Sequence, residues 1–121
     1  MSRPKVLIIE ESGEARAQLE RALRDEFDLL IARDPATAVP LAREQNPTLI
    51  LLDLGLPPNP ADPEEGLRLL REIRKTGVNA KVMVYSSYGQ RQHAVRAISY
   101  GAYDFFTKPL DLDLLKLLVH R

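Results

Sequence analysis

The residues that could carry chemistry begin with an aspartate at the end of an apolar run. Residues 49–52 are all apolar, and Asp53 follows them directly, with Gly55 and two prolines just beyond. A run this short, with a proline before it and turn residues after it, predicts a buried strand. Asp53 is then expected at the carboxyl end of that strand. By itself it could simply cap a loop, but a carboxylate near a core needs a partner.

Other polar side chains follow the other short apolar runs in the same way. Glu10 and Glu11 follow residues 6–9, Ser86 and Ser87 follow residues 82–85, and Lys108 follows residues 103–106. Each has an ordinary reading alone: acids at a helix entry, loop serines, a solvated lysine. The carboxyl ends of parallel strands, however, meet above one edge of a sheet. The pattern therefore predicts that these groups converge.

The chemistry of such a cluster is that of phosphoryl transfer. Glu10, Glu11 and Asp53 would repel one another unless a cation joined them. Mg²⁺ prefers oxygen ligands and is typically held by one or two carboxylates plus a phosphate. Lys108 adds a positive charge and Ser86 a neutral hydroxyl. Together they predict a site in which Asp53 is the nucleophile.

The elements that must position these groups alternate along the chain. Strands are predicted at residues 6–9, 29–32, 49–52, 82–85 and 103–106, and helices at 14–25, 34–44, 62 to beyond 73, 90–100 and 111–121. Asp34, Asp62 and Asp111 are expected to cap helices, and Pro40 to weaken or kink the second one. The alternation predicts an α/β fold with a doubly wound five-stranded parallel sheet and helices on both faces.

Composition narrows the range of functions. The 121 residues suit one domain, and 17 basic residues balance 17 acidic ones, so direct binding of nucleic acid or of an anionic membrane is not expected. The absence of cysteine excludes disulfides and thiolate chemistry. No apolar run is long enough for a membrane span or a signal peptide. These features predict a cytoplasmic domain.

Four fragments in this order resemble the receiver domain of two-component response regulators. They are I-I-E-E at 8–11, L-L-D-L-G-L-P at 51–57, V-M-V-Y-S-S at 82–87 and G-A-Y-D-F-F-T-K-P at 101–109. The resemblance covers essentially the whole chain and implies the flavodoxin-like strand order 2-1-3-4-5. It further implies that residues 1–121 form a receiver domain, N-terminal in a longer protein.

The resemblance also implies a role for each residue and a set of partners. Asp53 corresponds to the phosphoacceptor, and the Mg²⁺ site, which Mn²⁺ could also occupy, corresponds to Glu10, Glu11, Asp53 and Gly55. The phosphoryl-binding groups correspond to Ser86, Ser87 and Lys108, and the switch residues to Ser86 and Phe105. The phosphoryl donor would be a sensor histidine kinase. The domain would catalyse only its own phosphorylation and dephosphorylation. Its output would be homodimerisation and control of a downstream ATPase and DNA-binding module, hence transcription.

Two departures from the family pattern bear on these expectations. Glu11 stands where receivers usually have aspartate, and its side chain is longer by up to ~1.5 Å. Because Mg²⁺ tolerates little error around ~2.0–2.1 Å, weak metal binding is expected. The proline-rich loop at 57–63 is longer than usual. With E-G-L and G-A-Y-D-F it resembles regulators found with PEP-CTERM and exopolysaccharide systems, which activate sigma-54 polymerase.

Several alternatives stay open at the level of sequence. A pseudo-receiver, an interaction module that is not phosphorylated, is the nearest, and Glu11 is the feature that favours it. A flavin-binding domain is disfavoured because residues 10–14, with three glutamates, replace the small, hydroxyl-rich loop that a phosphate would need. A metal-dependent hydrolase or topoisomerase is disfavoured because Gly55 stands where a second acid would be needed. The leucine-rich stripe within residues 112–119 could be core packing or a partner surface.

Overall fold

The computed structural model describes residues 3–56, 62–87, 91–108 and 110–119. Residues 118 and 119 are described by their backbone only. Its strands are β1 (Lys5–Ile9), β2 (Asp28–Ala32), β3 (Leu49–Asp53), β4 (Lys81–Ser86) and β5 (Asp104–Thr107). Its helices are α1 (Gly13–Leu23), α2 (Pro35–Gln45), α3 (Glu64–Lys75), α4 (Arg91–Ser99) and α5 (Leu112–Val119). Among these helices, none has the length and apolar character needed to cross a membrane.

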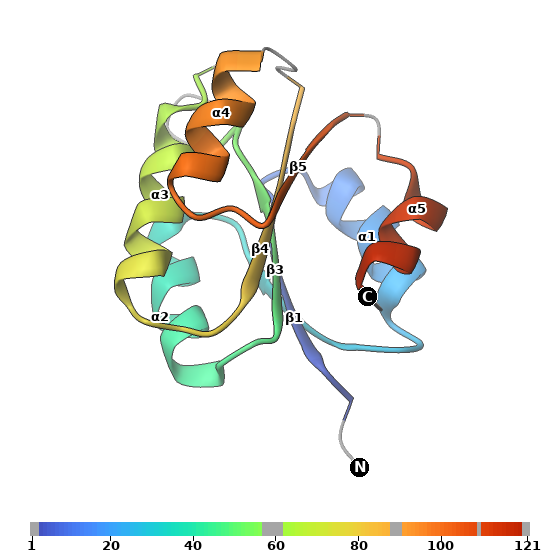
Figure 1. Cartoon of the computed structure of the whole chain (residues 1–121). Helices are drawn as coiled ribbons and strands as arrows, with labels where there is room; N and C mark the ends of the chain where they lie inside the picture. Colours follow the sequence, from blue (N-terminus) through green and yellow to red (C-terminus); the bar gives the residue numbers. More distant parts are fainter. Residues whose placement is uncertain (1–2, 57–61, 88–90, 109, 120–121) are drawn as a thin grey trace.

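The five strands form one parallel sheet in the order β2-β1-β3-β4-β5. Helices α2, α3 and α4 cover one face of the sheet, and α1 and α5 cover the other (Figure 1). The predicted fold class and strand order are therefore confirmed. The winding direction reverses between β1 and β3, and in open α/β sheets a ligand site lies above the strand ends at this point.

Side-chain alternation divides the core into two hydrophobic clusters. Leu7 and Leu52 belong to the cluster under α2, α3 and α4, whereas Ile8 and Leu51 belong to the cluster under α1 and α5. All five residues of β3 are buried, as expected for a central strand of a parallel sheet. Because successive side chains point to opposite faces, the alternation also decides which face receives the polar residue at each strand end.

Two of the three predicted helix caps are confirmed. Asp34 Oδ1 accepts a hydrogen bond from the Thr37 amide at 2.8 Å, and Asp111 Oδ1 accepts one from the Leu114 amide at 3.1 Å. The third prediction is wrong by one residue, because α3 begins at Glu64 with Pro63 at its N-cap. Asp62 Oδ1 instead accepts from the Glu64 amide at 3.0 Å, the i to i+2 bond of an Asx turn.

Helix α2 continues through Pro40 to Gln45, close to the predicted end. Proline removes one backbone hydrogen bond from a helix interior. Ala38 and Ala42, on either side of Pro40, are completely buried against the sheet. This packing holds the helix together across the interruption.

The described leucines of α5 divide between the core and the surface. Leu115 is 3% exposed and belongs to the core cluster under α1 and α5. Leu114 and Leu117 are 46% and 72% exposed. On α4, Val95 and Ile98 are also exposed. One side of α5 therefore packs on the sheet, and the other leaves apolar side chains at the surface.

Candidate functional site

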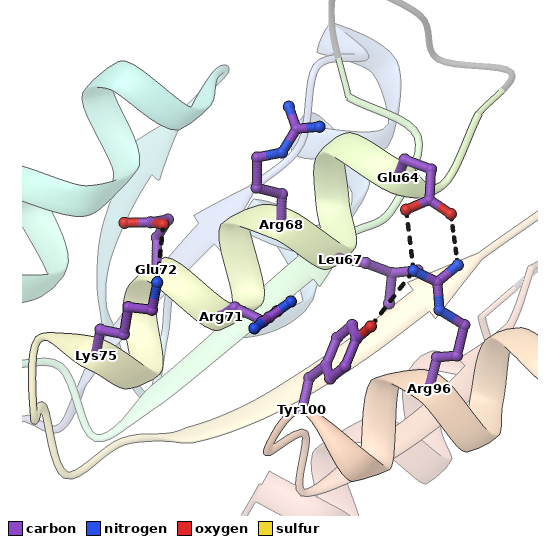
Figure 2. A pocket seen from close by; sticks show the side chains of 8 residues that line it. All are labelled: Glu64, Leu67, Arg68, Arg71, Glu72, Lys75, Arg96 and Tyr100. Carbon is purple, nitrogen blue, oxygen red and sulfur yellow. Dashed lines mark hydrogen bonds and ion pairs between the residues drawn. The ribbon is translucent and has the colours of Figure 1, made fainter.

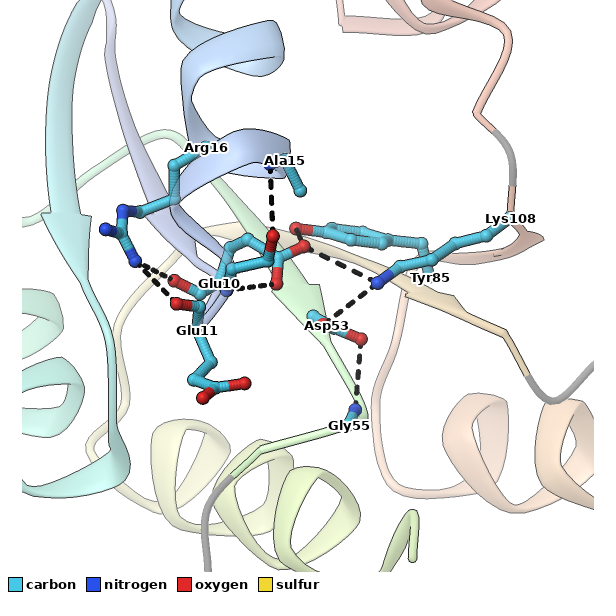
Figure 3. Close-up of polar contacts among 9 residues, drawn as sticks. Glu10, Glu11, Ala15, Arg16, Asp53, Gly55, Tyr85 and Lys108 are labelled. Carbon is cyan, nitrogen blue, oxygen red and sulfur yellow. Dashed lines mark hydrogen bonds and ion pairs between the residues drawn. The ribbon is translucent and has the colours of Figure 1, made fainter. Parts of the chain in front are cut away.

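Three polar side chains form a row across the carboxyl ends of neighbouring strands. Asp53, the last residue of β3, is in register with Tyr85 of β4. Ile9 of β1 is in register with Leu52 of β3, which places Glu10 beside Asp53. Residues in register on parallel strands point to the same face. Glu10, Asp53 and Tyr85 therefore lie together on the face covered by α1 and α5 (Figure 3).

Lys108, just beyond β5, supplies the positive charge of this cluster. Its Nζ lies 3.1 Å from Asp53 Oδ2 and 3.6 Å from Glu10 Oε1. Its backbone amide donates to the Ser86 carbonyl at 2.9 Å, which extends the pairing of β4 and β5 by one residue. The predicted convergence of Glu10, Asp53 and Lys108 is observed in the structure.

Glu10 is 1% exposed, and donors hold both of its carboxylate oxygens. The Tyr85 hydroxyl donates to Oε1 at 3.1 Å, and the Ser12 amide donates to Oε2 at 3.1 Å. Burial raises the pKa of Glu10 to about 7, and the adjacent Asp53 adds to this through a hydrogen bond and through charge repulsion. The Ser12 amide and Lys108 act in the opposite direction. Burial and the neighbouring Asp53 carboxylate therefore make Glu10 hold its proton more tightly.

The backbone after Asp53 is fixed by two close contacts. The Gly55 amide donates to Asp53 Oδ1 at 3.0 Å. Gly66 of α3 lies directly against this segment, because a Cβ there would stand 2.5 Å from Leu54 Cα. Only a glycine permits this approach of α3 to the strand end. The Asp53 carboxylate therefore has one oxygen held by a backbone amide and the other by Lys108.

A cavity of about 170 Å³ opens above Asp53 and contains most of the predicted site residues. It is lined by Glu10, Glu11, Ser12, Asp53, Gly55, Ser87 and Lys108. Ser87 is the serine that faces it. Ser86 is completely buried at the end of β4. Because it lies two residues after Val84, side-chain alternation puts it on the face that carries α4, where Phe105 is half-buried. The two residues predicted to form the switch thus lie on the opposite side of the sheet from Glu10 and Asp53.

The three predicted metal-binding carboxylates share this cavity without forming a ready-made ligand cluster. Glu11 is exposed, and its backbone carbonyl and that of Glu10 both accept from Arg16 Nη1 at 2.9 Å. Within the described part of the chain, no three acidic or histidine side chains are gathered closely enough to hold a metal ion. The donor set nevertheless fits a hard cation, since its acidic groups offer oxygens only and two of them are buried side by side.

Tyr85, Ser12 and Arg16 are site residues that the sequence analysis missed. Ser12 caps α1, its Oγ accepting from the Ala15 amide at 3.3 Å, and its own amide binds Glu10. For Tyr85 the sequence held a usable signal. Asp53 ends one strand, Tyr85 stands one residue before the serine that ends the next, and alternation puts both on one face. For Arg16 the sequence held none, because its contacts are to backbone carbonyls.

A second cavity, of about 320 Å³, lies between α3 and α4, away from these residues (Figure 2). Arg96 of α4 pairs with Glu64 of α3, its Nη2 donating to Glu64 Oε2 at 2.9 Å. Arg71 of α3 stacks on the ring of Tyr100 with 4.9 Å to the ring centre. These contacts tie α4 to α3. The cavity contains none of the predicted site residues.

The raised pKa of Glu10 predicts a specific pH dependence for Glu10→Gln. In the folded protein the pKa rises from its ordinary 4.5 to about 7, so folding favours the protonated form. Ionisation of Glu10 therefore costs stability as pH rises through this window, by up to roughly 3 kcal/mol. Urea unfolding without divalent metal should show Glu10→Gln close to the parent below pH 4.5 and increasingly more stable towards pH 7.

The control is Glu14→Gln, since Glu14 is exposed in the first turn of α1 and does not line the cavity above Asp53. The difference in unfolding free energy between Glu14→Gln and the parent should stay constant across this pH range. A constant difference between Glu10→Gln and the parent would show that Glu10 ionises in the folded protein as it does in the unfolded chain.

Known proteins resemble this chain over nearly its whole length. It is 35% identical over 120 residues to the response regulator protein PilR of Pseudomonas aeruginosa and 30% identical over 118 residues to the regulatory protein AtoC of Escherichia coli. These matches cover 98% and 97% of this chain but only 26% and 24% of the relatives. The chain thus spans about a quarter of the length of these curated relatives.

Among solved structures, the signal receiver domain of a putative Luxo repressor protein from Vibrio parahaemolyticus superposes with a TM-score of 0.87. It is 29% identical, and the match covers 98% of this chain and 88% of that one. A family model described as the response regulator receiver domain matches residues 6–120. With an aspartate, a lysine and paired acids at the strand ends where this fold places its ligands, the chain belongs to the receiver domains of response regulators.

Proposed function

We propose that Asp53 accepts a phosphoryl group from a sensor histidine kinase and that the modified domain controls a downstream output. The observation that carries this proposal is the Asp53 carboxylate, lying 3.1 Å from Lys108 Nζ at the floor of an open cavity. An oxygen of Asp53 forms a bond to phosphorus, while the bond from phosphorus to the kinase histidine nitrogen breaks and its electron pair returns to that nitrogen. The product is an aspartyl phosphate.

The surrounding groups suit the charge that this reaction develops. A phosphoryl group brings about two negative charges at neutral pH, and Lys108 is placed to meet them. Ser87 lines the cavity and offers a hydroxyl, whereas Ser86 would have to turn from its buried place to reach the group. Mg²⁺, or Mn²⁺ in its place, would be held by Glu10, Glu11, Asp53 and the Gly55 backbone. When bound, the metal offsets the negative charge of phosphoryl oxygens.

The proposed output passes through the opposite face of the sheet. Ser86 and Phe105 both lie on the face that carries α4, so a movement of Ser86 towards the phosphoryl group would change the packing there. Exposed apolar side chains lie on both helices that flank the edge strand β5: Val95 and Ile98 on α4, on this face, and Leu114 and Leu117 on α5, on the other, all at least 46% exposed. Such a surface suits association with a second copy or with an output domain.

We propose that the output is carried by further domains of a longer protein. The relatives are about four times longer than the chain, and PilR is named as a response regulator and AtoC as a regulatory protein. We propose transcription control through an ATPase and DNA-binding module, in the cytoplasm, as the corresponding function here. The loop at 57–61, on which the PEP-CTERM subgroup prediction partly depends, lies outside the described residues.

The first experiment tests phosphorylation at Asp53. With Mg²⁺ and acetyl phosphate, mass spectrometry of the intact chain should show one added phosphoryl group, lost in Asp53→Asn and retained in Asp25→Ala, which changes an exposed aspartate between α1 and β2. Modification of Asp53→Asn would place the acceptor elsewhere. A parent that stays unmodified with every divalent metal would favour the pseudo-receiver.

A second experiment concerns the length of Glu11. The Glu11 side chain is exposed at the edge of the cavity and longer than an aspartate by up to ~1.5 Å. Calorimetric titration should therefore show weak Mg²⁺ binding that Glu11→Asp tightens several-fold, with Glu14→Asp as the matched control. Tighter binding by the parent than by Glu11→Asp would mean that the backbone of residues 10–12 already accommodates the longer side chain.

A third experiment tests whether phosphorylation changes self-association through α4 and α5. Beryllofluoride with Mg²⁺, a mimic of the aspartyl phosphate, should strengthen self-association in sedimentation by about 5–150-fold, the usual range of coupling between two sites. Ser86→Ala should reduce this response, and Leu117→Glu, which charges the 72%-exposed leucine of α5, should abolish it. An unchanged association constant, with NMR shifts confined to the cavity, would show that the signal leaves by another surface.

A further inference from the structure

Tyr85 spans a distance that few side chains could cover. It starts on β4 and reaches Glu10 at the end of β1, so it crosses the whole width of β3. Neighbouring strands lie about 4.8 Å apart, which puts the two backbones roughly 10 Å from each other. Figure 3 shows the tyrosine side chain running over Asp53 towards Glu10. Its hydroxyl is one of the donors that hold the Glu10 carboxylate.

The tyrosine contacts both groups that flank Asp53. Its hydroxyl donates to Glu10 Oε1 at 3.1 Å, and Lys108 Nζ lies 5.3 Å from the centre of its ring, within the range of a cation–π contact. Tyr85 is 2% exposed and Glu10 is 1% exposed, so the hydrogen bond between them is shielded from bulk water. One side chain therefore restrains both the acid on one side of Asp53 and the base on the other.

Tyr85 also lines a cavity that is larger and more apolar than the one above Asp53. This cavity, of about 400 Å³, is lined by Glu10, Ala15, Gln18, Leu19, Tyr85, Lys108, Leu110 and Leu112. Glu10 and Lys108 line both cavities, whereas Asp53 lines only the smaller one and Tyr85 only the larger one. Glu10 and Lys108 are thus shared by the two cavities, and Tyr85 contacts both of these residues.

We propose that Tyr85 is a positioning residue of the phosphoryl site: its hydroxyl fixes the orientation of Glu10, and its ring supports Lys108. This inference rests on the function proposed above. Without the hydroxyl, Glu10 Oε1 still has the Lys108 ammonium 3.6 Å away. The glutamate is then free to turn to that charge and to compete with Asp53 for it. Its second oxygen would move away from the Ser12 amide.

The consequence is a weaker metal site and a changed contact at Ser12. Partners that orient a metal ligand typically contribute 10–100-fold to metal affinity. We therefore expect Tyr85→Phe, which keeps the ring and removes the donor, to weaken Mg²⁺ binding by about 10–100-fold. In the metal-free protein, the Ser12 amide resonance should shift and the amide should exchange with solvent faster, because its hydrogen bond to Glu10 Oε2 is disturbed.

The test compares Tyr85→Phe with Tyr100→Phe, which removes a hydroxyl from a tyrosine next to α4, remote from the site. NMR of the metal-free proteins follows the Ser12 amide, calorimetry follows Mg²⁺ binding, and urea unfolding verifies that each variant is folded. Tyr100→Phe should match the parent in both site measurements. Phosphorylation of the parent at Asp53 is measured in parallel.

An unchanged Ser12 amide, or Mg²⁺ binding as tight as that of the parent in Tyr85→Phe, would overturn the proposal and leave Tyr85 as a core residue. Failure of the proposed function is recognised separately, as a parent that neither binds Mg²⁺ nor accepts a phosphoryl group. The Ser12 amide would then decide alone whether Tyr85 orients Glu10.

Discussion

The central physical constraint in this domain is the burial of two carboxylates side by side. Glu10 and Asp53 stand at the ends of adjacent strands, 1% and 4% exposed. Taking a charged group out of water costs several kcal/mol unless partners compensate it, and two like charges add their repulsion. Four polar contacts of the site offset part of this cost. Lys108, the Tyr85 hydroxyl and the backbone amides of Ser12 and Gly55 all point their donors at these two groups.

The compensation is incomplete, and this suits a site that must change its charge. Four donors face two carboxylates, yet the pKa of Glu10 still rises to about 7, so the cluster favours the uptake of positive charge. A proton or a metal cation can supply it. The rest of the domain is built to tolerate this local cost, since β3 is buried along its whole length between two hydrophobic clusters. The buried sheet thus supports two neighbouring carboxylates whose ionisation reduces the stability of the fold.

The alternation of side chains along β4 separates chemistry from output. Tyr85 points to the face of Glu10 and Asp53, while Ser86, the next residue, points to the face of Phe105 and α4. One strand end therefore touches the site on one side and the proposed switch on the other. The ion pair between Glu64 and Arg96 and the stacking of Arg71 on Tyr100 fasten α4 to α3 on that second face (Figure 2). Any movement of α4 has to work against these contacts.

The pattern of the sequence alone determined the parallel α/β fold, the edge at which the site lies, and the convergence of Glu10, Asp53 and Lys108. These follow from short-range regularities: apolar runs, turn residues, and the rule that parallel strands end together. Helix boundaries were predicted to within a few residues, and α3 differs in its cap because Asp62 closes a turn instead. The tertiary structure decided which groups actually touch. Strand register and side-chain rotamers decide three of these contacts. Tyr85 crosses β3 to reach Glu10, Ser87 rather than Ser86 lines the cavity, and Arg16 binds two backbone carbonyls. Those are settled by packing between segments far apart in the chain, which no local pattern records.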